Sequence, residues 1–258
     1  MKKLCLFVAF SACAVLASAN LQAEQLKQPL AATQAIDLTQ KMHEGMPFWP
    51  GGVPFTMHRL VDYDQGYQLH KFEVGENTGT HVDAPSHFIK GKQSIDQIPL
   101  SNLIVPAVMI DIQDKVTGNP DYELTPSDIE AWEAANGKIP ANALVVLNTG
   151  WHKRFSDSER YINMDDSKVM HFPGYHPDSA KLLLERDVAG VGIDTLSLDF
   201  GGSKTFAFHV AMLKANKYQI ENMGNLDALP ATGATVVVGV LPVQGGSQAQ
   251  ARIIALLP

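Results

Sequence analysis

The stretch Asn77-Thr78-Gly79-Thr80-His81-Val82-Asp83-Ala84-Pro85-Ser86-His87-Phe88 decides how the rest of the chain is arranged. If its first part is extended, His81 and Asp83 point to the same face, because strand side chains alternate with a period of two. Pro85 cannot continue a regular ladder, so we expect a turn there that brings His87 back toward the other two. Two imidazoles and a carboxylate this close together predict a divalent metal site, for zinc or manganese, that needs further ligands.

The composition is that of an ordinary globular protein with room for a sizeable core. The chain has 258 residues, of which 45% are hydrophobic and 18% are charged, and its formal charge is −7. Such values are typical of a folded domain. Because the chain is acidic and has no basic run, the sequence gives no support for nucleic-acid binding.

The first 23 residues have the three-part organisation of a secretory signal peptide. Met1-Lys2-Lys3 is a basic start, the apolar run Leu4–Leu16 follows, and small residues offer cleavage after Ala19 or Ala23. The apolar run is shorter than the roughly 20 residues that a membrane span needs. We therefore expect export to the periplasm or the medium, with no membrane span and a mature domain over residues 24–258.

Both cysteines of the chain, Cys5 and Cys13, lie inside this predicted signal segment. A mature protein without them has neither a disulfide nor a thiol, so thiolate ligands and cysteine nucleophiles are excluded. The stretch Phe10-Ser11-Ala12-Cys13 resembles a lipoprotein cleavage box only faintly, because phenylalanine is a poor first residue there. The sequence does not favour a lipid anchor.

The rest of the chain alternates between strand and helix patterns. Apolar or alternating runs predict strands over residues 35–39, 55–60, 68–74, 103–112, 143–147, 190–194, 218–222, 234–241 and 252–257. Helices are predicted over residues 126–136, 178–186 and 206–214. No internal repeat or linker interrupts the series. We therefore expect one α/β domain with mixed sheets.

Two residues far from the opening stretch are candidates for the missing metal ligands. His209 lies in a mostly apolar stretch, Thr205–Leu213, and Glu221 follows in the short extended run Tyr218–Asn222. A polar group among apolar neighbours needs a partner. A metal shared with Asp83 would supply one for both side chains.

The loop Met46–Gly52 contains two prolines, two glycines and Trp49. Trp49 either packs at the rim of the core or forms the aromatic wall of a pocket. Its position on a loop favours the pocket, because binding residues concentrate on loops.

Together these motifs resemble the cyclase family of metal-dependent hydrolases, which includes bacterial kynurenine formamidases and isatin hydrolases. The family signature His-x-Gly-Thr-His-x-Asp-x-Pro-x-His corresponds to residues 77–87. The loop around Trp49, the stretches Asn148–Trp151, Phe172–Gly174 and Val191–Thr195, and the pair His209 and Glu221 match in order and approximate spacing. The resemblance covers essentially the whole chain after the signal segment. It implies a swivelling β/β/α fold that assembles into homo-oligomers.

The resemblance also implies an activity and a role for each matching residue. The implied activity is hydrolysis of an amide or lactam carbon–nitrogen bond in a small-molecule substrate by metal-activated water, as in the isatin hydrolases. The implied metal ligands are His81, Asp83, His209 and Glu221, the general base or proton shuttle is His87, and the substrate contact is Trp49.

One position departs from the signature, since Asn77 stands where the family has histidine. In the two-zinc formamidases that histidine is a metal ligand, whereas asparagine offers only a neutral carbonyl oxygen, a poor ligand for zinc. We therefore expect one firm metal position rather than two. Two alternative functions stay open: an arylformamidase acting on N-formylkynurenine, and a non-catalytic periplasmic binding protein. Retention of the other metal-site positions argues against the second.

Overall fold

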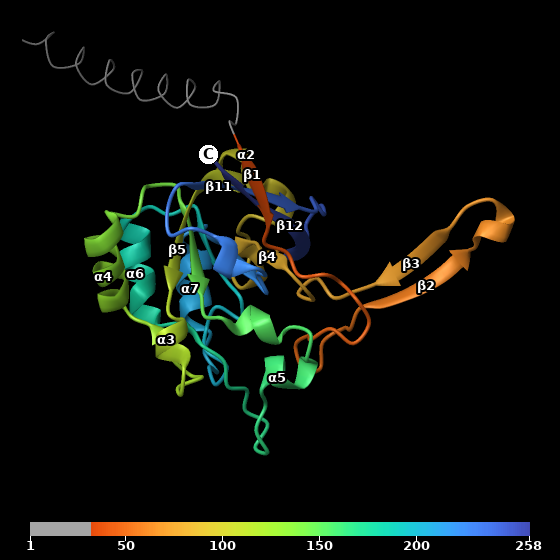
Figure 1. Cartoon of the computed structure of the whole chain (residues 1–258), viewed down its shortest axis with the longest axis horizontal. Helices are drawn as coiled ribbons and strands as arrows, with labels where there is room; N and C mark the ends of the chain where they lie inside the picture. The colour runs from red at the N-terminus through yellow and green to blue at the C-terminus, as the bar shows by residue number, and fades with distance from the viewer. Residues whose placement is uncertain (1–31) are drawn as a thin grey trace, which may run out of the picture. The chain divides into compact units, whose positions relative to one another are not determined.

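The centre of the fold is an eight-stranded mixed sheet that closes on itself (Figure 1). Its strands are β1 (Gln34–Asp37), β4 (His81–Asp83), β5 (Ile104–Asp111), β7 (Leu144–Asn148), β9 (Gly190–Ile193), β10 (Tyr218–Glu221), β11 (Ala234–Val240) and β12 (Gln248–Leu257). The structure, a computed structural model, describes residues 32–258, and the predicted signal segment with its cysteines lies outside them. Contacts gather Gln34–Leu257 into one compact unit.

The sheet closes because β4 has a partner on each edge. The strand order is β1-β12-β11-β5-β7-β9-β10-β4, and β4 also pairs with β12. Strands β5, β7, β9 and β10 run parallel to one another, whereas β4 is antiparallel to both β10 and β12. The α/β fold with mixed sheet pairing is as expected, and the closed barrel is an addition to it.

The parallel strands are buried on both faces, which explains their nearly continuous apolar sequences. Val108 and Ile110 of β5 belong to the outer core with residues of the helices. Ala107 and Met109, one step out of phase, belong to the core inside the barrel. The period-two alternation of a strand therefore separates two hydrophobic cores, and each buried valine or leucine in them contributes about 1.5–3 kcal/mol.

Helices cover the outer face of the parallel strands (Figure 1). The covering helices are α4 (Pro126–Asn136), α6 (Pro177–Glu185) and α7 (Ala207–Lys214). Three shorter helices are α2 (Leu100–Leu103), α3 (Gln113–Val116) and α5 (Ser158–Ile162), and Leu103 of α2 belongs to the core inside the barrel. Helix α4 begins at Pro126, as the sequence predicts. Thr125 just before it and Asp128 in its first turn form a capping box. Between residues 32 and 258, no helix is both long and apolar enough for a membrane crossing.

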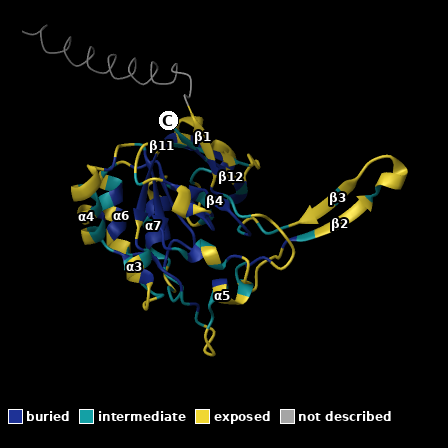
Figure 2. Ribbon diagram, in the orientation of Figure 1, coloured by how far each residue is buried: buried dark blue, intermediate teal, exposed yellow. Residues whose placement is uncertain are grey.

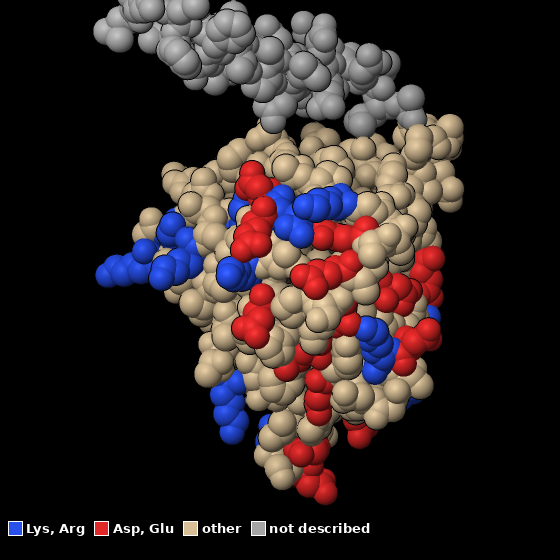
Figure 3. Space-filling model, turned by 90° about the vertical axis from the view of Figure 1, so that its left-hand side faces the viewer, with Lys and Arg blue, Asp and Glu red and all other residues tan. Residues whose placement is uncertain are grey.

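The helical face is polar on its outside. Acidic and basic side chains are interspersed over it (Figure 3). The Arg186 guanidinium, just after α6, donates to the Glu133 carboxylate of α4 at 2.7 Å. This ion pair joins the two helices over the outer core.

A two-stranded hairpin extends away from the barrel, and we call residues 55–74 the arm (Figures 1 and 2). It consists of β2 (Thr56–Val61), the 3-10 turn Tyr63–Gln65 and β3 (Leu69–Glu73). Both strands were predicted from the sequence, over residues 55–60 and 68–74, but their separation from the main sheet was not. Phe55 at the base of the arm is buried, but most of the arm's large apolar side chains are exposed, namely Met57, Leu60, Tyr63, Tyr67, Leu69 and Phe72. A second small sheet pairs β6 (Glu123–Leu124) with β8 (Gly174–Tyr175).

Candidate metal centre

The signature stretch folds into β4 and a 3-10 turn that begins at Pro85, as the sequence predicts. Val82 belongs to the core inside the barrel, so His81 and Asp83 face outward on the other side of the sheet. Both are fully buried all the same. The antiparallel register sets Glu221 of β10 directly opposite His81. Directly opposite residues share one face of a sheet, so pairing alone brings this carboxylate to the imidazole.

His209 reaches the same place from the first turn of α7. The Asp199 carboxylate accepts hydrogen bonds from the backbone N–H of Phe208 (3.0 Å) and of His209 (3.1 Å), and from His209 Nδ1 at 2.6 Å. One carboxylate thus caps the helix and orients the ring. His209 Nε2 is left 3.0 Å from Glu221 Oε1 and 3.4 Å from Asp83 Oδ2.

The donor set of this cluster fits a divalent cation. His81 Nδ1 bonds to the Gly79 carbonyl at 2.8 Å, so a neutral His81 ring carries a lone pair on Nε2. That atom lies 3.3 Å from Asp83 Oδ1 and 3.3 Å from Glu221 Oε2. Although these are ion-pair distances, the alignment gives no hydrogen bond, and buried His81 Nε2 and Asp83 Oδ2 have no hydrogen-bond partner. Ligand atoms of His81, Asp83 and Glu221 all lie within 4.8 Å of one another. A buried polar group without a partner is costly, and one cation could serve as the partner of all these atoms.

The electrostatics of the cluster also favour positive charge. Burial alone lowers the pKa of His81, but the Asp83 and Glu221 carboxylates outweigh it and raise that pKa to about 10. Burial likewise lowers the pKa of His209, yet the surrounding carboxylates hold it well above its ordinary value. Burial raises the pKa of Asp83, but the close imidazoles of His209 and His81, together with the charge of His87, keep it far below its usual range. Protons on His81 and His209 would bring two positive charges to the cluster, and one divalent ion would bring the same charge.

An aromatic wall borders the cluster. Phe88 and Phe206 lie with their ring centroids 5.3 Å and 5.8 Å from that of His209, and 5.6 Å from each other. Trp49 joins the wall through Phe206 at 6.1 Å. His87 is half-buried and packs edge-on against Phe88 at 4.7 Å. His87 therefore stands beside the cluster and not within it, at a wall whose Phe88 is 37% exposed.

Phe206 has a left-handed backbone, with φ 48° and ψ 44°. Among residues 32–258, the other non-glycine residues with positive φ are asparagine, aspartate or lysine. A bulky side chain in this region costs on the order of 1–3 kcal/mol and persists only where the surroundings enforce it. The strain falls on the residue that carries the ring beside His209.

Asn222 links the strand that carries Glu221 to the strand that carries His81. It is buried, its Nδ2 donates to the Gly79 carbonyl at 3.1 Å, and its Oδ1 lies 2.9 Å from the Tyr161 hydroxyl. The backbone carbonyl of Asn222 accepts from the Thr80 hydroxyl. The Gly79 carbonyl therefore lies within hydrogen-bond distance of two side chains, His81 of β4 and Asn222, the residue after Glu221.

Sequence reasoning missed three residues that support the cluster, namely Asp199, Asn222 and Gln248. Gln248 Nε2 donates to Asp83 Oδ1 at 2.6 Å, and nothing local in the sequence marks it. Asp199 had a weak signal, because it is an acid between the apolar residues Leu198 and Phe200, a context similar to the one that pointed to His209.

Asn77, where the signature departs, takes no part in the cluster. It is half-buried, and its Oδ1 lies against Gly75, 3.2 Å from where a β-carbon on that glycine would stand.

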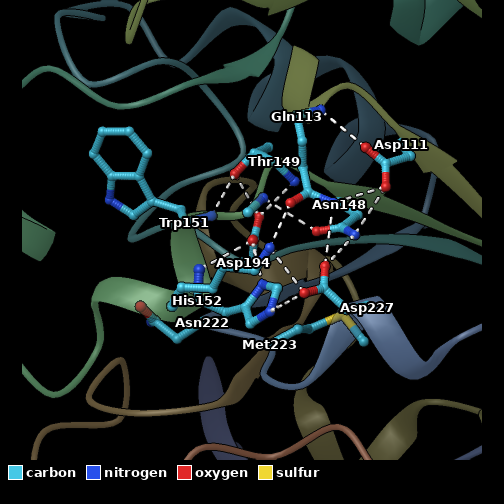
Figure 4. A network of polar contacts seen from close by, with 12 residues as sticks. Asp111, Gln113, Asn148, Thr149, Trp151, His152, Asp194, Asn222, Met223 and Asp227 are labelled. Carbon is cyan, nitrogen blue, oxygen red and sulfur yellow. Dashed lines mark hydrogen bonds and ion pairs between the residues drawn. The ribbon is translucent and has the colours of Figure 1, made fainter. Parts of the chain in front are cut away.

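A separate polar network lies at the carboxyl ends of β5, β7 and β9 (Figure 4). Asn148 Nδ2 donates to the carboxylates of Asp111 (3.2 Å) and Asp227 (3.3 Å). His152 Nδ1 lies 2.9 Å from the buried Asp194 carboxylate. The network fixes the loop after β7 to the end of β9.

Comparisons with known proteins agree with this architecture. The Cyclase family model matches residues 36–200. Isatin hydrolase of Roseibium aggregatum is 33% identical over 213 residues, which are 78% of this chain and 81% of that protein. Kynurenine formamidase of Bacillus mycoides is 23% identical over 75% of this chain and 84% of that protein. The solved structure of isatin hydrolase A from Labrenzia aggregata bound to benzyl benzoate has a TM-score of 0.83 at 33% identity and covers 93% of this chain and 99% of that chain.

Proposed function

This chain belongs to the cyclase family, and we propose that it is a metal-dependent hydrolase that opens the ring of an aromatic lactam of the isatin type. The observation that carries the proposal is the buried convergence of two imidazoles and two carboxylates directly under an aromatic wall. The 33% identity with an isatin hydrolase over most of the chain supports it. The kynurenine formamidase relatives support an acyclic formamide substrate only distantly.

His81, Asp83, His209 and Glu221 would hold one zinc or manganese ion. A divalent cation there would polarise the substrate carbonyl and lower the pKa of a water molecule. Two nitrogen and two carboxylate ligands suit either metal. Because Asn77 stands outside the cluster, the chain's own ligands support one metal position and not two.

His87 is proposed to move the proton. Beside the cluster and half-buried, it can accept a proton from the attacking water and return it to the leaving nitrogen. In the reaction the water oxygen joins the carbonyl carbon and the ring carbon–nitrogen bond breaks, so the lactam becomes one open-chain product that carries both a carboxylate and an amine. Asp199 meanwhile holds His209 with Nε2 facing the cluster.

The aromatic wall would bind the planar part of the substrate. Trp49, Phe88 and Phe206 present ring faces and edges next to the cluster. Stacked aromatic pairs add about 0.5–1.5 kcal/mol to the burial of apolar area. The related structure that holds benzyl benzoate, a ligand with two aromatic rings, fits this assignment.

The test is turnover by purified protein of known metal content, with isatin and N-formylkynurenine as parallel substrates. We expect about one metal ion per chain and hydrolysis of isatin. His87→Ala should keep its metal and lose on the order of 10²–10⁴-fold in turnover. His171→Ala, which removes a surface histidine paired with Asp121, is the matched control. Faster hydrolysis of N-formylkynurenine would select the formamidase alternative, and no turnover of either by metal-loaded protein would select the binding protein.

We also propose that the chain is exported and that residues 24–258 form the mature domain. The basic start, apolar run and small residues of the first 23 positions support this. Mass spectrometry of the periplasmic fraction should find a new N-terminus at residue 20 or 24. An intact Met1 on protein recovered from the cytoplasm would contradict export.

We further propose a homo-oligomer in which the arm docks on a second copy of the chain. A lone two-stranded hairpin is marginally stable in water, and clustered exposed apolar side chains mark an interaction surface. Leu60→Lys, on the arm, should shift the mass measured by light scattering toward the monomer. Leu100→Lys, at an even more exposed leucine outside the arm, is the control. A monomeric unmodified protein would refute the assembly.

A further inference from the structure

A cavity of about 500 Å³ lies at the carboxyl ends of β5 and β7, and the metal cluster and its aromatic wall contribute nothing to its lining. Its volume is in the range of small-molecule sites. In sheets with parallel strands, ligands bind beyond the carboxyl ends of the strands. The residues of the lining used below are Val116, Pro120, Trp151 and Arg154.

Arg154 is the one cation in the cavity lining, and it is held in a fixed plane. Its guanidinium stacks 3.8 Å over the Trp151 ring. Trp151 is itself buried, and its indole N–H donates to the Tyr161 carbonyl at 2.8 Å. Stacking on an aromatic face leaves the in-plane N–H donors of a guanidinium free. A planar group of donors is therefore presented in a defined orientation.

In the part of the chain that the structure describes, no acidic side chain balances this charge. Among residues 32–258, Arg154 makes no side-chain hydrogen bond or ion pair, although it is half-buried. Burial lowers the pKa of Arg154, and the charge of nearby Arg160 lowers it further. A partly desolvated cation beside a second cation is unfavourable without an anion. Arg154 is half-buried and has the exposed Arg160 nearby, and such a cation stands out in a chain whose formal charge is −7.

We propose that this cavity is a second ligand site, separate from the metal centre, that binds a small organic carboxylate. The carboxylate pairs with the guanidinium of Arg154 through two parallel hydrogen bonds, the geometry that arginine favours. Its apolar body lies against Val116 and Pro120. If Arg154 served only to shield the Trp151 ring from water, an uncharged side chain would do as well. The guanidinium without an acidic partner is therefore the feature that points to an anion.

The probe is benzoate, titrated into the full metal-loaded protein and followed by the indole N–H signals in ¹H–¹⁵N correlation spectra. The chain has three tryptophans in different places: Trp49 at the aromatic wall, Trp151 at the cavity, and Trp132 bonded to the Met109 carbonyl. Single Trp→Phe variants assign the signals. Benzoate at the metal centre moves the Trp49 signal, so the two sites are read separately.

We expect a saturable shift of the Trp151 signal with benzoate. Arg154→Gln should weaken that response about tenfold or more, and Arg154→Lys should weaken it less, because lysine keeps the charge and loses the fork. The Trp49 response should be the same in both variants. No Trp151 shift, or an equal shift in folded Arg154→Gln, would overturn the proposal, with Arg154→Lys deciding if the first variant fails to fold.

Two further titrations, with benzamide and with inorganic phosphate, test the chemical class of the ligand. Benzamide, which has the same body without the charge, should bind at least tenfold more weakly than benzoate. Equal binding of benzamide would overturn the role of Arg154. Inorganic phosphate should not compete at equal concentration, and a Trp151 shift with phosphate but none with benzoate would overturn the carboxylate assignment. The outcome is independent of turnover, so failure here leaves the hydrolase proposal untouched.

Discussion

At the scale of single residues, the Asp199 carboxylate has two structural roles at once. It accepts the backbone N–H groups that begin α7 and it also accepts Nδ1 of His209. Because one proton on Nδ1 leaves the lone pair on Nε2, this contact selects the tautomer that can bind a cation.

Asp199→Asn should lower metal affinity about 10- to 100-fold while the protein stays folded. The amide still accepts one hydrogen bond but no longer stabilises the ring as an anion does. Competition with a chromophoric chelator measures the affinity. Asp178→Asn, at an exposed acid in the first turn of α6, is the control, and equal affinities in the two variants would contradict the role of Asp199.

Phe206 allows strain and ring contact to be measured apart. Phe206→Gly and Phe206→Ala both remove the ring, but only glycine adopts φ 48° without penalty. We expect the glycine variant to be more stable than the alanine variant by about 1 kcal/mol in urea unfolding. Both variants should raise KM for an aromatic substrate, because both lose the ring. An alanine variant as stable as the glycine variant would show that the backbone at residue 206 leaves the left-handed region and holds no strain.

Metal binding should release protons. With the pKa of His81 raised to about 10 and that of His209 also raised, both rings hold protons at neutral pH that a cation must displace. As pH rises toward these values the competition weakens, so apparent metal affinity should increase between about pH 6 and pH 9. Calorimetry in two buffers of different ionisation enthalpy should find about one to two protons released per ion. A pH-independent affinity would show that the rings are neutral before binding.

At the scale of elements, the site depends on the register of three strands. β4 carries two candidate ligands, β10 sets Glu221 opposite His81, and β12 sets Gln248 opposite Asp83. Local signals in the sequence identified β4, the turn at Pro85 and the capped start of α4. They could not show that β4 pairs with β12, because Gln248 lies 165 residues from Asp83 and no local periodicity encodes that pairing.

The same distinction explains what was found and missed at the site. His81, Asp83, His209 and Glu221 were proposed as ligands from residue type, context and family resemblance, and the structure brings their side chains together. Gln248 and Asn222 act only through neighbours that folding brings to them. The arm shows the limit for packing, since its alternating strands look like any half-buried hairpin although both are largely exposed.

Asn222→Gly tests the link between β10 and β4. Glycine keeps the left-handed backbone at φ 54° but removes the side chain that bonds Gly79. We expect metal affinity to fall about tenfold, the scale reported for lost supporting contacts around a metal. Asn225→Gly, also at φ 54° but bonded to Asp37, should leave it unchanged. An equal loss of metal affinity in both variants would assign the effect to the backbone and not to the hydrogen bond between Asn222 and Gly79.

At the scale of the whole molecule, a bound ion would connect β4, β10 and α7. Adding zinc or manganese should therefore stabilise the fold, by about 4 kcal/mol at a free concentration 1,000 times Kd, or about 10 °C in Tm. Differential scanning calorimetry with and without metal measures this shift. Asp83→Ala should abolish it, and a shift that survives in that variant would place the ion elsewhere.

The double pairing of β4 also has a consequence for the order of folding. Contacts between residues so far apart in sequence form slowly, because the long intervening loop must close first. His81 and Asp83 must therefore wait for β10 and β12 before they form a binding site. Affinity alone ranks copper and zinc above manganese at most nitrogen and oxygen sites. The ion that the protein acquires is then decided by which metals are free in the compartment where β12 finally meets β4.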